Sequence, residues 1–166
     1  KPLPEVLDLC SNIGIDTSIT TNLVPFTKTN VDSFVKNCKW IKASINAGTR
    51  ETYSQIHQCD PADFDRVLKN VELAVETREK NRYSCTIGVQ MVLLPENNNE
   101  AYLLAEKLKG LGADYFVIKP YSQHNSSTTR KYENIEYQQN LTLEDDLAEL
   151  NSDSFNIVYR KLTIQR

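Results

Sequence analysis

The stretch Trp40-Ile41-Lys42-Ala43-Ser44-Ile45-Asn46, with its exit Ala47-Gly48-Thr49-Arg50, decides the fold. Its composition predicts a buried strand that ends in a short polar turn, followed by a helix from about Thr49. Ser44 and Asn46 share a parity, so on a strand both side chains point to the same face. In parallel α/β sheets and barrels, ligands bind where the carboxyl ends of the strands converge. The two side chains therefore indicate a binding site, unless they only satisfy backbone groups at the turn.

The composition is that of one globular domain. The chain has 166 residues, of which 40% are hydrophobic and 25% charged, and its net charge is -3. This charge gives no reason to expect a nucleic-acid surface. No apolar run reaches the length of a membrane span, and the first residues do not resemble a signal peptide. We therefore expect a cytoplasmic protein without a nucleic-acid or membrane partner.

The cysteines are widely spaced along the chain. None of the four belongs to a CxxC or CxxxCxxC cluster, which argues against a disulfide framework or a local metal site and for a reducing compartment. We expect no metal ligand among them. They are Cys10, Cys38, Cys59 and Cys85.

Short apolar runs alternate with helical patterns along the chain. Strands are predicted over residues 15–20, 40–46, 86–94 and 113–118. Helices are predicted over residues 3–10, 30–35, 49–57, 60–75, 98–110 and 142–150, with Asn98 or Asn99 as the N-cap of the fifth. Strands separated by helices require right-handed crossovers, hence a parallel sheet. The fold class is α/β, with about four parallel strands and outer helices. Residues 154–165 have strand composition, but their pairing is left open.

All four predicted strands end in polar, turn-forming residues. If the carboxyl ends lie side by side, these residues form one concave polar rim, where the function is expected. The four ends are Thr21-Asn22, Ser44-Ile45-Asn46, Pro95-Glu96-Asn97 and Lys119-Pro120-Tyr121-Ser122-Gln123-His124.

Taken together, four segments resemble the radical S-adenosylmethionine (radical SAM) enzymes. They are ITTN at residues 19–22, IKASINAGTRETYSQIH at 41–57, VQMVLLPENN at 89–98 and FVIKPYSQH at 116–124. The resemblance covers residues 1–124 and implies the third to sixth strands of a partial (β/α)6 barrel. Residues 125–166 are then an extension that consists of a loop, a short helix and a terminal strand.

The resemblance implies which residues bind S-adenosylmethionine. Ser44 and Asn46 match the motif that hydrogen-bonds its ribose or carboxylate, and Asn22 would face the cofactor or substrate. The residues that would flank the adenine are Asn97, Lys119 and Pro120. The residues expected at the substrate are Gln90, Tyr121 and His124.

Two motifs of the family are absent from these 166 residues: the CxxxCxxC loop that holds a [4Fe–4S] cluster, and the Gly-Gly-Glu motif that holds the methionine amino group. Thiolates hold such clusters, and four scattered cysteines cannot supply the loop. By the resemblance, the chain is a piece of a larger enzyme. We expect the piece to be inactive, with no cofactor bound and no catalytic residue that the sequence identifies.

The resemblance implies the reaction of the whole enzyme. That enzyme would use electrons from a donor to cleave S-adenosylmethionine reductively. The 5′-deoxyadenosyl radical formed would abstract hydrogen from a small-molecule or peptide substrate.

Two other interpretations stay open. A metal-independent barrel enzyme of the aldolase type would need a Schiff-base lysine, for which Lys42 and Lys119 are the candidates. Alternatively, the chain is a non-catalytic binding module. In a barrel that lacks its first strands, the strand at residues 15–20 is an unpaired edge. We therefore predict that the fragment dimerises through this edge.

Overall fold

The computed structural model describes residues 2–126, 128, 130–135 and 141–160. The strands in this part of the chain are β1 (Thr17–Thr21), β2 (Cys38–Ser44), β3 (Thr86–Leu93), β4 (Tyr115–Pro120) and β5 (Asn156–Tyr159). The helices are α1 (Leu3–Asn12), α2 (Val31–Asn37), α3 (Arg50–His57), α4 (Ala62–Asn81), α5 (Ala101–Gly110) and α6 (Leu141–Ala148). None of these helices is long and apolar enough to cross a membrane.

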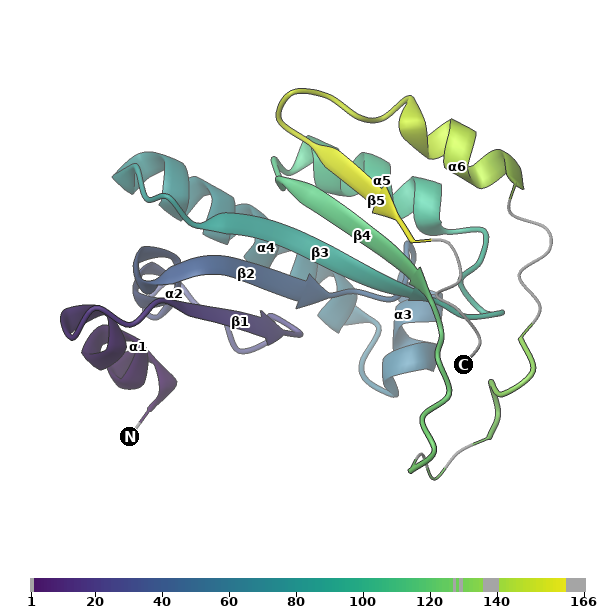
Figure 1. Ribbon diagram of the computed structural model, residues 1–166, viewed down its shortest axis with the longest axis horizontal. Helices are drawn as coiled ribbons and strands as arrows, with labels where there is room; N and C mark the ends of the chain where they lie inside the picture. Colours follow the sequence, from purple (N-terminus) through teal and green to yellow (C-terminus); the bar gives the residue numbers. More distant parts are fainter. Residues whose placement is uncertain (1, 127, 129, 136–140, 161–166) are drawn as a thin grey trace.

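The strands form one sheet in the order β1-β2-β3-β4-β5, and every pair is parallel (Figure 1). Neighbours in the sequence are therefore neighbours in the sheet, as in the wall of a (β/α) barrel. The predicted α/β class and partial barrel are confirmed. The four predicted strands are all present, with ends displaced by no more than two residues.

A fifth strand completes the described sheet, where the sequence predicted about four. Residues 154–165, whose pairing was left open, contain β5. This strand pairs in parallel with β4, and its first residue, Asn156, lies opposite Tyr115. Leu147 and Phe155, on either side of the turn before β5, are buried in the same core as the strands. The division of the chain at residue 124 stays a prediction.

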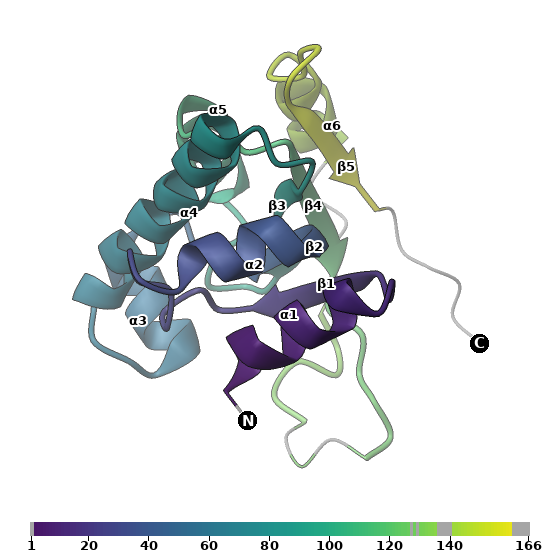
Figure 2. The same cartoon turned by 90° about the vertical axis from the view of Figure 1, so that its left-hand side faces the viewer.

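The core lies on one face of the sheet. Along β2, Ile41 and Ala43 are fully buried, whereas Lys42 and Ser44 between them are only half-buried. Helices α3, α4 and α5 gather on one side of the sheet in Figure 2, and their apolar residues join Ile41 and Ala43 in the core. The other side, which we call the open face, carries Lys42, Ser44 and the residues in register with them.

The open face has one close approach that requires glycine. Gly88 of β3 lies opposite Tyr115 of β4, and a Cβ at residue 88 would clash with the Tyr115 ring. The ring therefore lies directly on the glycine backbone. This contact fills the open face on the amino-terminal side of Gln90.

Candidate functional site

Two asparagines join the carboxyl ends of β2 and β3. Asn46 Oδ1 accepts a hydrogen bond from Val92 N at 2.9 Å. Asn97 Nδ2 donates to Asn46 O at 2.8 Å and to Val92 O at 2.9 Å, and its Oδ1 accepts from Leu94 N at 2.8 Å. Asn97 is fully buried. Its side chain is therefore fully used in structural hydrogen bonds, and its place beside the adenine stays a prediction.

Asn46 has hydrogen-bonding capacity left for a ligand. Oδ1 accepts from Val92 N and keeps a second lone pair, and Nδ2 makes no hydrogen bond within the described part of the chain, so both ends of the amide can face a bound molecule. The side chain is half-buried, on the same side as Ser44, whereas Ile45 between them is fully buried. The shared parity expected for Ser44 and Asn46 is thus seen in their burial.

Ser44 and Gln90 lie opposite each other on the open face. They are register partners between β2 and β3, and Gln90 is in turn opposite Val117 of β4. Both polar side chains are half-buried, and neither makes a hydrogen bond within the described part of the chain. This pair is available to a ligand lying on the sheet.

The two candidate Schiff-base lysines also lie on the open face. Lys42 is opposite Gly88, and its Nζ is 5.5 Å from the ring centroid of Trp40. Lys119 is opposite Val92, at the carboxyl end of β4. The position of the lysines is thus compatible with a carbonyl substrate, and the lysine mechanism stays a prediction.

A hollow of about 440 Å³ lies at the carboxyl end of β4. Three residues expected at the cofactor or substrate, Lys119, Pro120 and Tyr121, line it together. The other lining residues are Val92, Ser122 and Arg160. The hollow combines basic groups with the apolar surfaces of valine and proline.

The segment after β4 is attached to the turn after β3. Glu96 Oε1 accepts hydrogen bonds from Lys131 Nζ at 2.5 Å and Tyr132 Oη at 3.0 Å. The Tyr132 ring packs edge-on against Tyr121, with ring centroids 5.4 Å apart. Burial raises the pKa of Glu96, but the hydrogen bonds from Lys131 and Tyr132 outweigh it and lower this pKa below its ordinary value. The carboxylate therefore stays ionised and holds the segment beside the hollow.

Asn22 and His124 lie farther from this arrangement. Asn22 follows β1, is exposed, and accepts a hydrogen bond from Val24 N through Oδ1. The next residue, Leu23, is fully buried with φ 59°, a left-handed conformation that is costly for leucine. His124 is exposed and accepts from Ser126 N through Nδ1. The structure thus groups Ser44, Asn46 and Gln90, and places Asn22 and His124 at separate points of the rim.

Sequence reasoning missed Glu100. The N-cap of α5 is Glu100, not Asn98 or Asn99, and its carboxylate reaches the start of α3. Oε2 accepts from Gly48 N at 2.7 Å and Thr49 N at 3.2 Å, while Oε1 accepts from the hydroxyls of Thr49 at 2.9 Å and Thr52 at 2.6 Å. These partners are some 50 residues away in the chain, so no local pattern could have identified the contact.

The described residues give no ligand set for an iron–sulfur cluster. The four free cysteines lie in α1, at the start of β2, after α3 and before β3, and two of them are buried. Among the described residues, no group of three or more His, Cys, Asp or Glu side chains could hold a metal ion. The cysteines of this chain therefore do not fit a [4Fe–4S] cluster.

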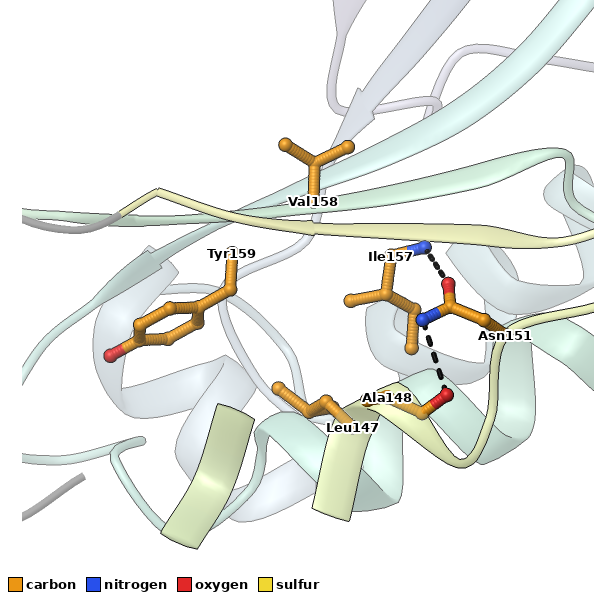
Figure 3. Close-up of a pocket in the computed structure, with 6 residues that line it drawn as sticks. All are labelled: Leu147, Ala148, Asn151, Ile157, Val158 and Tyr159. Atoms are coloured by element: carbon orange, nitrogen blue, oxygen red, sulfur yellow. Dashed lines mark hydrogen bonds between the residues drawn. The ribbon is translucent and has the colours of Figure 1, made fainter. Parts of the chain in front are cut away.

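A second hollow, of about 340 Å³, lies between α6 and β5 (Figure 3). Asn151 closes one end: its Oδ1 accepts from Ile157 N at 2.7 Å, and its Nδ2 donates to Ala148 O at 3.2 Å. Figure 3 shows Ile157 and Tyr159 on the side of α6 and Val158 on the opposite side of the strand. The hollow is thus on the helix side, away from the open face.

Comparison with known proteins identifies the fold. No protein-family model matches the chain, and no curated protein matches it. Solved structures do match. SuiB of Streptococcus suis bound to S-adenosylmethionine is 18% identical with a TM-score of 0.72, and the match covers 95% of this chain and 36% of SuiB. A domain of the pyruvate-formate lyase-activating enzyme from Bacteroides vulgatus is 15% identical with a TM-score of 0.67, over 96% of this chain and 89% of that one.

These neighbours are radical SAM enzymes. The fold is that of radical SAM enzymes. The likeness at these identities concerns the fold, and the chain spans just over a third of the length of SuiB. SuiB has also been solved with its precursor peptide SuiA, with a TM-score of 0.71 to this chain. The resemblance noted in the sequence is therefore confirmed at the level of the fold.

Proposed function

We propose that this chain is part of a radical SAM enzyme, and that the open face and the carboxyl ends of β2, β3 and β4 bind S-adenosylmethionine. One observation carries the proposal: the strands are parallel and in chain order, with the core on one face and half-buried polar side chains on the other. A protein that buries both faces of its sheet leaves no such surface. The polar open face therefore supports the proposal that this side of the sheet is the inner wall of a barrel that holds a ligand.

The residues present fit S-adenosylmethionine. The Ser44 hydroxyl and the Gln90 amide can each donate and accept hydrogen bonds, which suits ribose hydroxyls. The Nδ2 hydrogens of Asn46 can donate, which suits a ribose oxygen or the methionine carboxylate. Pro120 and Lys119 line the hollow that would take the adenine. Each side chain binds or orients the cofactor, and none is assigned a covalent step.

With a [4Fe–4S] cluster, bound S-adenosylmethionine supplies a 5′-deoxyadenosyl radical for hydrogen abstraction. The cysteines described above do not fit that cluster, so we derive no catalytic step for this chain and propose that it is inactive alone. The proposed substrate is a small molecule or a peptide. SuiB, which shares the fold, was solved with a precursor peptide, and this supports the peptide class.

The first test measures binding of S-adenosylmethionine to the longest gene product that contains this chain, monitored by amide chemical shifts in solution. We expect shifts at the backbone of Ser44 to Asn46 and at the side-chain amides of Asn46 and Gln90. Ser44→Ala should weaken binding. Ser84→Ala, at an exposed serine before β3, is the matched control and should not. Shifts that avoid β2 and β3 would overturn the proposed site.

The second test uses the longest gene product that contains this chain, reconstituted anaerobically with iron and sulfide. We expect it to cleave S-adenosylmethionine to 5′-deoxyadenosine, and Ser44→Ala to slow the reaction. A product that binds no cluster would refute the radical mechanism. The lysine alternative would then be tested by borohydride trapping of a carbonyl substrate on Lys42 or Lys119.

A further inference from the structure

The turn between β2 and α3 is closed by a carboxylate from the turn between β3 and α5. Glu100 accepts four hydrogen bonds there, two from the backbone N–H groups of Gly48 and Thr49 and two from the hydroxyls of Thr49 and Thr52. The two backbones are also in close contact, since a Cβ at residue 48 would lie 2.8 Å from Glu100 O. The carboxylate therefore holds the turn that directly follows Asn46 and Ala47.

The place that Glu100 occupies has a distinct electrostatic character. The first N–H groups of a helix carry a partial positive charge and have no partner within the helix. After a parallel strand, at the carboxyl edge of a sheet, such a helix start commonly binds a phosphate group. Here Glu100 Oε2 is bonded to the N–H groups of Gly48 and of the N-cap Thr49, directly before the first turn of α3, and Oε1 is bonded to the hydroxyls of Thr49 and Thr52. A phosphate would have to displace the carboxylate or lie against its negative charge, and both are unfavourable.

We infer that Glu100 is a positioning and specificity residue of the S-adenosylmethionine site. It fixes the turn after Asn46, and it closes the start of α3 to phosphate, so the site takes an adenosine ligand without a phosphate group. The inference rests on the proposed function for its ligand. Its electrostatic part, the exclusion of phosphate, concerns Glu100 and α3 alone.

The test of specificity compares the binding of two adenosine ligands, S-adenosylmethionine and adenosine 5′-monophosphate, to the longest gene product that contains this chain. In Glu100→Ala, we expect the ratio of their dissociation constants to shift toward the monophosphate by about tenfold, a change of about 1.4 kcal/mol. A merely structural role would weaken both ligands equally and leave the ratio unchanged, which would overturn the inference. Glu106→Ala, an exposed position on the same helix, is the matched control and should leave both affinities unchanged.

The test of phosphate exclusion needs no adenosine ligand. Inorganic phosphate should shift the Gly48 and Thr49 amide signals and raise the thermal midpoint in Glu100→Ala, and do neither in the wild-type chain. Equal shifts in both proteins would overturn the inference. If the alanine variant does not fold, Glu100→Gln keeps the side-chain shape and removes the charge, and the same two outcomes apply to it.

The two proposals can fail separately. If the longest gene product that contains this chain binds no S-adenosylmethionine, the proposed function is refuted, while the phosphate experiment still decides whether Glu100 closes the start of α3. Conversely, if that gene product binds S-adenosylmethionine and its Glu100→Ala variant shows an unchanged ratio of the two dissociation constants, the proposed function stands and the role of Glu100 is overturned.

Discussion

Asn97→Ala should be among the most destabilising single substitutions in this protein. The Asn97 side chain is fully buried and makes three hydrogen bonds, to Leu94 N, Asn46 O and Val92 O. Alanine would leave all three backbone groups without this partner. These groups lie where β2 and β3 end, so the substitution also loosens the turn that presents Asn46.

The size of the effect follows from the number of groups left unpaired. A buried polar group that loses its partner costs about 1–3 kcal/mol. With three groups, some of which water can reach after the side chain is removed, we expect a loss of about 3–4 kcal/mol in the free energy of unfolding. Domains of this size have about 5–15 kcal/mol in total. The variant should fold, with a clearly lowered denaturation midpoint.

The assay is equilibrium unfolding in urea, monitored by circular dichroism. Asn99→Ala is the matched control, since Asn99 is exposed and two residues away; it should change stability by about 0.5 kcal/mol or less. If Asn97→Ala lowers the free energy of unfolding by less than about 1 kcal/mol, or by no more than Asn99→Ala does, the explanation by unpaired buried backbone groups is refuted.

Asn97→Asp adds a dependence on pH. The introduced carboxylate can still accept from Leu94 N, but its charge faces the carbonyls of Asn46 and Val92. Its pKa in the folded state should therefore lie above the unfolded value, so the variant is most stable below the unfolded pKa and loses stability as the pH rises through the folded value. Unfolding at pH 4 and pH 7, relative to wild type, measures this loss. An equal deficit at both pH values would contradict it.

Two further predictions concern packing and protonation. Gly88→Ala should lower the free energy of unfolding by about 1–3 kcal/mol, because the added Cβ would clash with the Tyr115 ring. The control Gly110→Ala places its Cβ in open space and should be neutral or stabilising. Equal unfolding midpoints for the two variants would contradict this prediction. Burial lowers the pKa of His57, so the folded state favours the neutral ring, and stability is lost as the pH falls through the folded pKa. His57→Phe should reduce the difference in the free energy of unfolding between pH 7 and pH 5. The control His124→Phe, at an exposed position, should leave this difference unchanged. If His57→Phe also leaves it unchanged, the argument is refuted.

Local pattern was enough to predict most of the framework. The apolar run at residues 86–94 and the alternation of helices and strands follow from side-chain periodicity, which short segments carry by themselves. The same reasoning predicted that Ser44 and Asn46 share a face, since strand parity needs no knowledge of neighbours. The sequence did not predict which strand pairs with β5, because the side-chain pattern of a strand of four residues is too short to identify its partner.

The tertiary structure decided what the polar residues at the strand ends do. In the sequence, Asn97 and Glu100 are simply polar residues of one turn. In the structure, Asn97 is bonded to Asn46, 51 positions away, and Glu100 to Gly48, 52 positions away. Which donors meet which acceptors depends on how the ends of β2 and β3 converge. The sequence by itself determined the parallel α/β framework and that Ser44 and Asn46 lie on the same face of the sheet. Only the packed sheet decided that Asn46 accepts from Val92 N and that a carboxylate closes the start of α3, because hydrogen bonds between distant segments exist only once the strands are in register.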